Sequence, residues 1–196
     1  ILNILFPIYC IVCGKSGYSI CKKCILLSPT AERESLSWIY PIFDYRHIPI
    51  KKSIWLLKYK RKRNLAKIFG EVMYERIVEE LSELSILNNF CDPLIIPIPL
   101  SKKRYRERGY NQSLLLAEHI VKLDKKNPFP SNLVLLNNIL LKVKDTEHQA
   151  RLKDRNRRLE NLSGSFIVKN KNLINERNII LIDDVATTGA TLKEAK

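Results

Sequence analysis

The stretch Asn178-Ile-Ile-Leu-Ile-Asp-Asp-Val-Ala-Thr-Thr-Gly-Ala-Thr191 carries the strongest fold signal in this sequence. The apolar run at its start predicts a strand that is buried on both faces. Asp183 and Asp184 follow that run, and residues 186–189 predict a tight loop that leads into a helix starting near Ala190. In open α/β sheets, ligands bind outside the carboxyl ends of the strands. The stretch therefore predicts a ligand site at the edge of a sheet.

The turn after the acid pair has the composition of a phosphate-binding loop. Backbone N–H groups converge on a phosphate at a helix N-terminus, and threonine hydroxyls add donors. Gly189 allows a close backbone approach or a positive φ. Asp183 and Asp184 precede the turn, where carboxylates accept hydrogen bonds from sugar hydroxyls or hold a hydrated Mg²⁺. A strand–turn–helix without a ligand is the alternative interpretation. The candidate phosphate-binding residues are Ala186, Thr187, Thr188, Gly189, Ala190 and Thr191.

Four of the five cysteines form two Cys-x-x-Cys pairs that are separated by a short loop. This spacing is typical of a closed structural zinc site with four sulfur ligands. Gly14 and Gly17 are expected to provide the turns that direct the thiolates inward. Redox dithiols and disulfides are the alternatives, but redox pairs usually open a helix within a βαβ unit. The predicted ligands are Cys10, Cys13, Cys21 and Cys24.

Cys91 stands apart from these pairs, and we expect it to be a small buried side chain. The apolar residues 1–12 lack a basic leader and a small-residue cleavage site, so we interpret them as packing around the cysteine module. No apolar run approaches the roughly 18 residues that a membrane-spanning helix needs. We therefore expect a cytoplasmic protein without disulfides.

Strand and helix patterns alternate along the rest of the chain, which predicts an α/β fold with a mostly parallel sheet flanked by helices. Helices are predicted to start at Pro49, at Leu65 and after Asn111, a good N-cap. Residues 144–162 are polar and basic, and they predict a mobile loop or a hairpin tip. Strands are predicted at residues 38–45, 94–99, 133–143, 166–168 and 178–182. The predicted domains are a small zinc-ribbon-like module, residues 1–30, and an α/β domain, residues 38–196.

The chain has 34 Lys and Arg residues against 20 Asp and Glu residues, which gives a net charge of +14. This surplus favours anionic partners such as phosphates, nucleic acid or an acidic membrane surface, and a basic protein that is merely soluble is the alternative. Basic clusters occur at residues 51–63, 102–108 and 151–158. Aromatic residues interleave with them, a combination typical of single-strand binding by stacking and phosphate attraction. These are Trp55, Tyr59, Tyr105 and Tyr110, although helical spacing assigns Trp55 to the core.

Residues 178–191 resemble the signature loop of type I phosphoribosyltransferases. The resemblance implies that Asp183 and Asp184 contact the 2′- and 3′-hydroxyls of a ribose, and that the following turn holds its 5′-phosphate. Residues 97–113 are similar to the corresponding segment of the competence protein F (ComF) family. The cysteine module agrees with that family, and the order of short motifs extends the resemblance over nearly the whole chain. The remaining motifs are Leu57-Lys-Tyr59, Asp145-Thr-x-x-Gln149, Arg158, Asn161, Gly164 and Phe166.

The ComF resemblance implies a protein linked to DNA uptake and its machinery, with a type I phosphoribosyltransferase-like core that binds 5-phosphoribosyl diphosphate together with Mg²⁺. In that fold the loop after the first core strand approaches the diphosphate, and residues 144–162 correspond to a loop that closes over the site. The family continues beyond Lys196 through another helix and strand, so the C-terminal sheet edge is expected to be incomplete. The diphosphate-binding candidates are Ser101, Lys102, Lys103 and Arg104.

Two functions remain open on this reasoning. One is a binding module that senses a phosphoribosyl ligand while its basic face handles single-stranded DNA. The other is an active phosphoribosyltransferase of nucleotide or nucleobase metabolism with an unidentified nitrogen acceptor. Asp183 and Asp184 are then catalytic and stabilise an oxocarbenium-like state, while Arg104, Arg106 and Arg108 neutralise the departing diphosphate. A transcription regulator that has lost catalysis is a third, weaker alternative.

Overall fold

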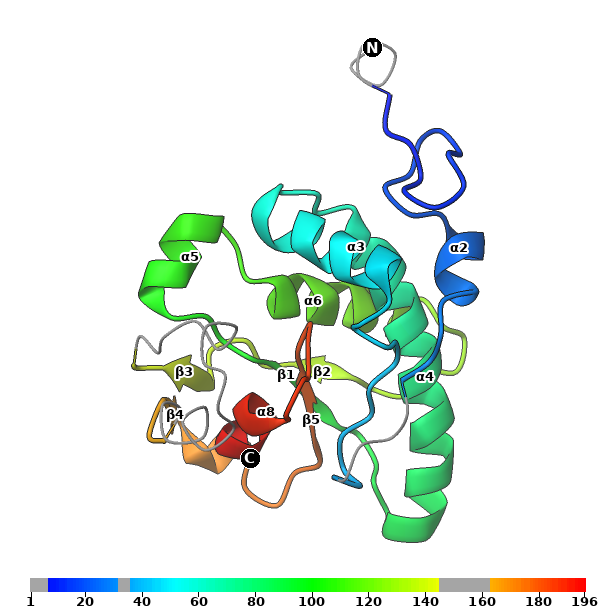
Figure 1. Ribbon diagram of the computed structural model, residues 1–196. Coiled ribbons are helices and arrows are strands. Elements are labelled where there is room, and N and C mark those ends of the chain that lie inside the picture. The colour runs from blue at the N-terminus through cyan, green and yellow to red at the C-terminus, as the bar shows by residue number, and fades with distance from the viewer. Residues whose placement is uncertain (1–6, 32–35, 145–162) are drawn as a thin grey trace. The chain divides into compact units, whose positions relative to one another are not determined.

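The structure is a computed structural model that describes residues 7–31, 36–144 and 163–196. The chain divides into two compact units, Ile1–Phe69 and Gly70–Lys196 (Figure 1). Helix α4 (Leu65–Asn88) starts in the first unit and ends in the second. Within the described residues, no helix is both long enough and apolar enough to cross a bilayer.

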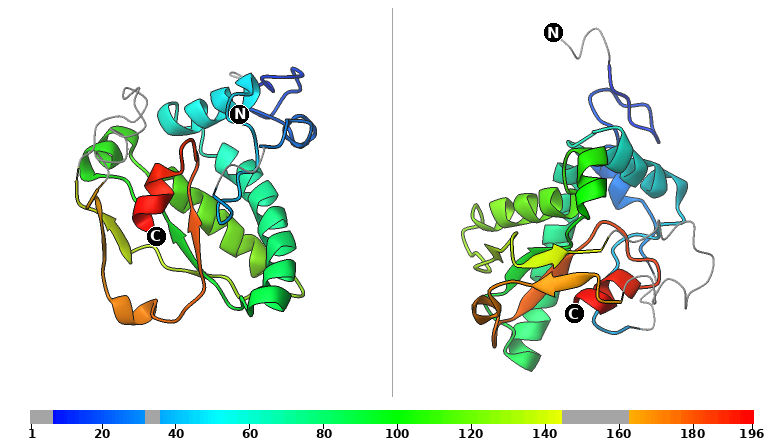
Figure 2. Two further views of the ribbon diagram at one scale, coloured as in Figure 1. Left: turned by 60° about the horizontal axis from the view of Figure 1, so that its bottom comes forward. Right: turned by 90° about the vertical axis from the view of Figure 1, so that its left-hand side faces the viewer.

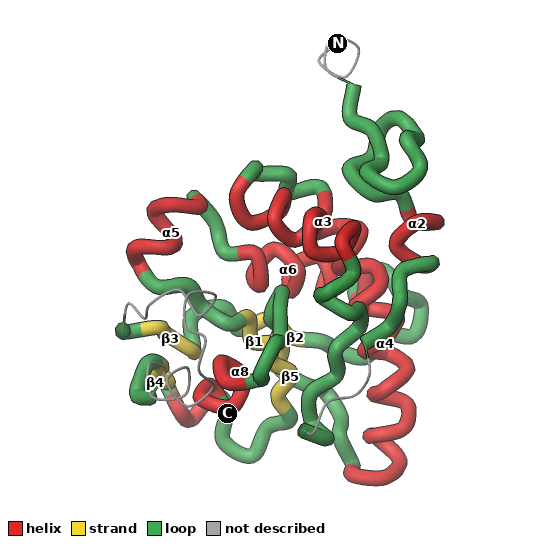
Figure 3. The backbone as a smooth tube through the Cα atoms, viewed as in Figure 1, coloured by secondary structure: helices red, strands yellow, loops and turns green. Residues whose placement is uncertain are grey.

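Helices and loops make up the described part of the first unit, in which Figure 3 shows no strand. The short helix α2 (Lys22–Leu26) follows the first three cysteines, and α3 (Ile48–Tyr59) has Pro49 in its first turn. Proline suits that position because its missing N–H would have no helical partner there. Ile50 and Ile54 lie on the buried face of α3, as the sequence pattern predicts.

Two predictions for the first unit are wrong. Residues 38–45 form no strand, and only an isolated bridge joins Phe43 to Thr30. Pro41 accounts for this difference, because proline has no N–H to donate to a strand ladder. Trp55 is not a core residue, since 45% of its surface is exposed. Its side chain falls outside the buried face of α3, which is made of Ile50, Ser53, Ile54 and Leu57.

A small parallel sheet forms the centre of the second unit. In the part of the chain that the structure describes, its strand order is β2 (Val134–Leu135), β1 (Leu94–Pro97) and β5 (Ile179–Ile182). β1 pairs in parallel with both neighbours, and the last residues of β1 and β5 lie opposite each other. Helix α6 (Gln112–Asp124) packs against all three strands (Figure 2). The predicted α/β architecture, a parallel sheet with helices beside it, is confirmed at this level.

The other elements of the second unit are short. Helix α5 (Lys102–Arg108) lies between β1 and α6 in the chain, and α8 (Ala190–Ala195) follows β5. A separate antiparallel pair is formed by β3 (Leu140–Lys142) and β4 (Phe166–Val168). A 3-10 turn, Lys171–Leu173, follows β4 in the chain. The predicted strand at residues 166–168 is thus confirmed, but it belongs to this antiparallel pair and not to the parallel sheet.

The predictions for two other strands need correction. Residues 133–143 form two separate strands, because the chain bends at the polar Asn137 and Asn138 between β2 and β3. The strand expected at residues 178–182 exists, but three of its four residues are only half-buried. Among the described strands, β5 is the last at its side of the sheet, whereas the central β1 is fully buried. The loop expected at residues 144–162 lies outside the described residues from 145 onward.

A buried carboxylate joins two helices of the second unit to the loop that enters β2. Asp124, at the end of α6, is 1% exposed. Its Oδ2 accepts a hydrogen bond from Leu133 N at 2.9 Å, and its Oδ1 accepts from Ser131 N at 2.8 Å and from the Tyr74 hydroxyl at 3.3 Å. Burial raises the pKa of Tyr74, the hydrogen bond from Asn127 offsets part of the rise, and Asp124 adds to it. The Tyr74 hydroxyl therefore stays protonated and donates to Asp124.

Asp124→Ala is expected to lower the free energy of unfolding of the second unit by about 3 kcal/mol, because two backbone N–H groups and a hydroxyl lose their acceptor. Urea titration followed by circular dichroism measures the change. Glu118→Ala, at an exposed position of the same helix, is the matched control. It is expected to change the stability by less than about 0.5 kcal/mol. Equal losses in the two variants would contradict the role assigned to Asp124.

Candidate functional site

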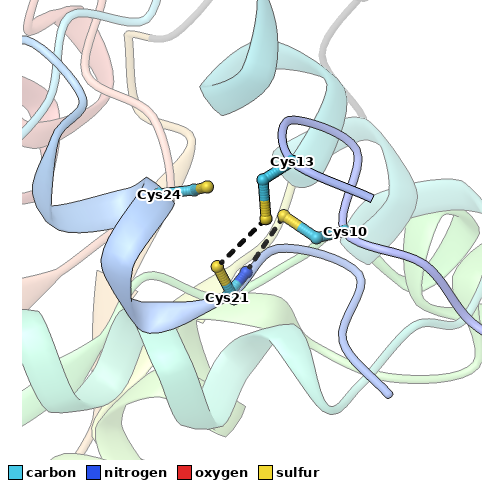
Figure 4. Close-up of side chains that lie close together, drawn as sticks. All are labelled: Cys10, Cys13, Cys21 and Cys24. Atoms are coloured by element: carbon cyan, nitrogen blue, oxygen red, sulfur yellow. Dashed lines mark hydrogen bonds between the residues drawn. The ribbon is translucent and has the colours of Figure 1, made fainter. Parts of the chain in front are cut away.

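The first cysteine pair lies in a tight hairpin of the first unit. Cys10 N donates to Lys15 O at 2.8 Å, and Gly14 N donates to Cys10 O at 2.9 Å. Gly14 and Gly17 have positive φ values of 72° and 88°, so they supply the predicted turns. Figure 4 shows that the hairpin directs the sulfurs of Cys10 and Cys13 toward the second pair.

The second cysteine pair lies at the start of α2, with Cys21 as the N-cap and Cys24 in the first turn. All four sulfur atoms lie within 4.8 Å of one another, and Cys13 Sγ is 3.7 Å from Cys21 Sγ. Four sulfurs at about 2.3 Å from a tetrahedral zinc ion are about 3.8 Å apart, whereas a disulfide needs about 2.05 Å. The cluster therefore has the dimensions of a site for a metal ion such as zinc, and none of its cysteines forms a disulfide.

Two thiols of this cluster have opposite pKa shifts. Burial alone would raise the pKa of Cys10, but hydrogen bonds from the backbone of Cys13, Val12 and Cys21 outweigh it and lower the pKa from 9.0 to about 6. Burial, with added contributions from the neighbouring thiols, raises the pKa of Cys24 to about 12. A coordinated cation would cancel the rise in the pKa of Cys24, because a cation stabilises the thiolate form of each cysteine that binds it.

The module differs in one respect from the predicted ribbon. Its second Cys-x-x-Cys pair opens a helix instead of forming a second turn, and redox pairs also occupy that position. The approach of all four sulfurs to one point favours a single metal-ligand set over two independent redox dithiols.

The prediction of a buried Cys91 is wrong, because its side chain is exposed. It lies in a polar turn between Asn89 and Asp92, both at positive φ, and that polar composition is visible in the sequence.

A second candidate site lies where β1 and β5 end. Because the strands are parallel, their carboxyl ends meet at one edge of the sheet. Ile98 N donates to Ile182 O at 2.9 Å, at the end of the two strands. Asp183 is the next residue and therefore lies at this edge. Gly189, with φ 69°, is the N-cap of α8, which begins at the predicted residue. Asp183 and residues 185–192 line a small, shallow pocket that is partly open to solvent.

The N-terminus of α6 holds Asp183. Its Oδ1 accepts hydrogen bonds from the Ser113 hydroxyl at 3.1 Å and from Asp184 N at 2.9 Å. Asn111 caps α6 as predicted, since its Oδ1 accepts from Ser113 N at 3.0 Å, and its Nδ2 donates to Ile98 O at 2.9 Å. The positive end of the helix dipole favours a carboxylate at this position. Hydrogen bonds thus join the ends of β1 and β5 to the start of α6.

Sequence analysis missed Ser113, whose partner Asp183 is distant in the chain. The sequence does place Ser113 in the first turn of a capped helix, but nothing in it brings that turn beside the acid pair.

Two other residues differ from their predicted roles. Arg108 is buried and donates from Nη1 to Gln112 Oε1 at 2.8 Å, which places it in the junction between α5 and α6. Tyr110 is also buried, so its ring offers no surface for stacking.

The diphosphate-binding candidates lie at the start of α5, and three residues separate them from the end of β1. Ser101 is buried and caps α5, since its hydroxyl accepts from Arg104 N at 3.4 Å. Lys102 and Lys103 are exposed. Because β1 and β5 are parallel, this segment leaves the sheet at the same edge as the acid pair. The basic cluster at residues 151–158 lies outside the described residues.

Comparison with known proteins decides the family of this chain. No family model matches it. It is 33% identical to Competence protein ComFC of Bacillus subtilis over 190 residues, which are 93% of this chain and 68% of that protein. The chain belongs to the ComF family. Competence protein F of Haemophilus influenzae is 42% identical to this ComF-family chain over 102 residues, 51% of the chain and 41% of the relative. DNA utilization protein YhgH of Escherichia coli (strain K12) is 26% identical over 176 residues, which are 89% and 68% of the two proteins.

This ComF-family chain is expected to hold one metal ion such as zinc, because four sulfurs within 4.8 Å of one another can complete the coordination of the ion. Elemental analysis of the purified protein measures the content, and sulfur-to-cobalt absorption after Co²⁺ substitution is a second readout. Cys13→Ser is expected to lose the ion and the absorption. Cys91→Ser, which changes a cysteine outside the cluster, is expected to keep both. Equal metal content in the two variants would count against a four-sulfur site.

Proposed function

We propose that this protein binds 5-phosphoribosyl diphosphate, or a related phosphoribosyl ligand, where β1 and β5 end, and that it serves DNA uptake. The observation that carries the proposal is the acid pair, Asp183 and Asp184, directly before the pocket-forming turn of residues 186–191. A phosphoribosyl diphosphate has a phosphate at one end, hydroxyls in the middle and a diphosphate at the other end. The turn, the acid pair and the basic start of α5 supply a chemically suitable partner for each part.

Each part of the ligand has candidate residues in this arrangement. The backbone N–H groups and threonine hydroxyls of residues 186–191 suit the 5′-phosphate, since Gly189 allows a close approach. Asp183 and Asp184 accept hydrogen bonds from the ribose hydroxyls. Residues 101–104 bring two lysines and an arginine for the diphosphate. Mg²⁺ bound with the diphosphate neutralises part of its charge.

The alternative is an active phosphoribosyltransferase of nucleotide or nucleobase metabolism. The bond between the anomeric carbon and a diphosphate oxygen breaks, and diphosphate leaves with the electron pair. A nitrogen acceptor then bonds to the carbon and loses a proton. A fixed carboxylate near this carbon stabilises the positive charge of the oxocarbenium-like state, and the hydrogen bond from Ser113 fixes Asp183 in that way. Diphosphate release with one member of a panel of nitrogenous bases supports the enzyme, whereas release with none supports a binding module.

Single-stranded DNA is the second ligand in this proposal. Two relatives are named competence proteins and a third is named a DNA utilization protein. The net charge of +14 supports a polyanionic partner, because lysine and arginine contacts with phosphates supply most non-specific DNA affinity. Zinc as the structural ion of the cysteine cluster and a cytoplasmic location belong to the same proposal. So do the domains at residues 1–30 and 38–196, and the DNA-uptake machinery as a partner.

Isothermal titration calorimetry with 5-phosphoribosyl diphosphate and Mg²⁺ tests the ligand proposal. The wild-type chain is expected to bind. The double variant Asp183→Asn/Asp184→Asn is expected to lose more than about tenfold in affinity, because amides replace the charged acceptors. Glu118→Gln, which changes an exposed carboxylate outside the pocket, is expected to bind like the wild type. A folded wild-type chain that does not bind would overturn the proposal.

Ser113 provides a separate test of how the acid pair is held. Ser113→Ala is expected to weaken ligand binding about tenfold, the size of one hydrogen bond to a charged group, and Ser113→Thr is expected to retain binding. In an Asp183→Ala background, Ser113→Ala is expected to have no further effect. A double-mutant cycle measured by calorimetry gives this coupling. Equal weakening in both backgrounds would show that Ser113 acts on the general structure and not through Asp183.

A further inference from the structure

Helix α3 carries an exposed aromatic surface in addition to its buried face. Ile48, Lys52, Trp55 and Tyr59 recur at intervals of four, three and four residues, which is the spacing of one helix face. Trp55 is 45% exposed, Tyr59 is 47% exposed and Ile48 is 76% exposed. We call the polar and aromatic part of this surface the α3 stripe. It consists of Lys51, Lys52, Trp55, Tyr59 and Lys60, all of them exposed.

The two aromatic rings of the α3 stripe lie side by side. The ring centroids of Trp55 and Tyr59 are 6.1 Å apart, and the ring planes are tilted by 46°. Lys60 Nζ lies 5.4 Å from the centroid of the Trp55 ring. Exposed rings next to ammonium groups are the combination that holds unpaired bases by stacking and their phosphates by charge.

The charge of this region selects a polyanion. The sequence has no Asp or Glu between Asp44 and Glu71. A segment with this excess of basic residues attracts a phosphate backbone. Asp44, at its start, pairs with Arg46 at 3.1 Å. A basic or neutral protein surface would gain nothing from this charge. The basic residues of the segment are Arg46, Lys51, Lys52, Lys58, Lys60, Arg61, Lys62, Arg63 and Lys67.

We propose that the α3 stripe binds single-stranded DNA, with bases stacked on Trp55 and Tyr59 and phosphates held by the lysines. The inference rests on the DNA part of the proposed function and gives it a location. A single strand fits better than a duplex, because the bases of a duplex already stack on each other and leave no face for the rings. Among the described residues, helix α5 carries the competing basic cluster. It carries a single aromatic residue, Tyr105, and its first residues are the diphosphate candidates.

Fluorescence anisotropy of a fluorescein-labelled oligothymidylate at low salt tests the proposal. Trp55→Ala and Tyr59→Ala are each expected to weaken binding about tenfold, the size of one lost base stack, whereas Trp55→Phe is expected to keep most of the affinity. Tyr105→Ala, which removes an exposed ring from α5, is the matched control and is expected to bind like the wild type. In a Trp38→Phe chain, in which Trp55 is the remaining tryptophan, the DNA is expected to quench the intrinsic fluorescence.

The outcomes separate this inference from the proposed function. If Trp55→Ala and Tyr59→Ala bind DNA like the wild type, the α3 stripe is not the DNA-binding surface, although the chain still binds DNA. If Tyr105→Ala alone loses DNA affinity, the DNA lies on α5. No wild-type binding at low salt would overturn both. Light scattering tests a second copy of the chain as the occupant, since conversion of a dimer into a monomer by Trp55→Ala would also overturn the proposal. The variants are expected to unfold at the same temperature as the wild type, which excludes misfolding as the cause of a change in DNA affinity.

Discussion

The parallel pairing of β1 with β5 determines where the candidate ligand-binding residues of the second unit lie. The two strands end together, and the hydrogen bond from Ile98 to Ile182 continues the ladder one residue further. The acid pair, the turn and the start of α5 therefore leave the sheet at the same edge. Ser113, at the start of α6, bonds to Asp183 at that edge. A register slip of one residue would turn each β5 side chain to the other face of the sheet and break this bond.

How much of the molecule the sequence predicts depends on how local each interaction is. The Asn111 cap and the turn before α8 are predictable, because each depends on a side chain or a glycine and its adjacent backbone. Burial depends on which distant segments cover a residue, and this explains why Trp55 is exposed against expectation. Cys91 is exposed as well, in a turn whose polar composition the sequence does show. Ser113 lies 70 residues before its partner, so no local pattern could identify it. Family resemblance supplied the ligand roles of the pocket residues, and these stay predictions.

The segment around the four cysteines of the first unit has little else to stabilise it. In its described part, that segment contains one short helix and isolated bridges, and Ile20 and Ile25 are its fully buried aliphatic residues. A segment of this size buries too little apolar surface to order its backbone unaided. The four sulfurs are too far apart for disulfides and close enough for one ion. Metal binding and folding of this segment are therefore expected to be a single event.

Among the described residues, no further strand pairs with the outer side of β5, so this side of its backbone has no ladder partner there. A strand edge of this kind accepts an extended segment of matching register, which is how many sheets gain a strand from another chain or another part of their own. A strand added in parallel here would end at the same edge of the sheet as the acid pair. A segment that pairs with β5 would therefore lie close to residues 183–191 without any change in those residues.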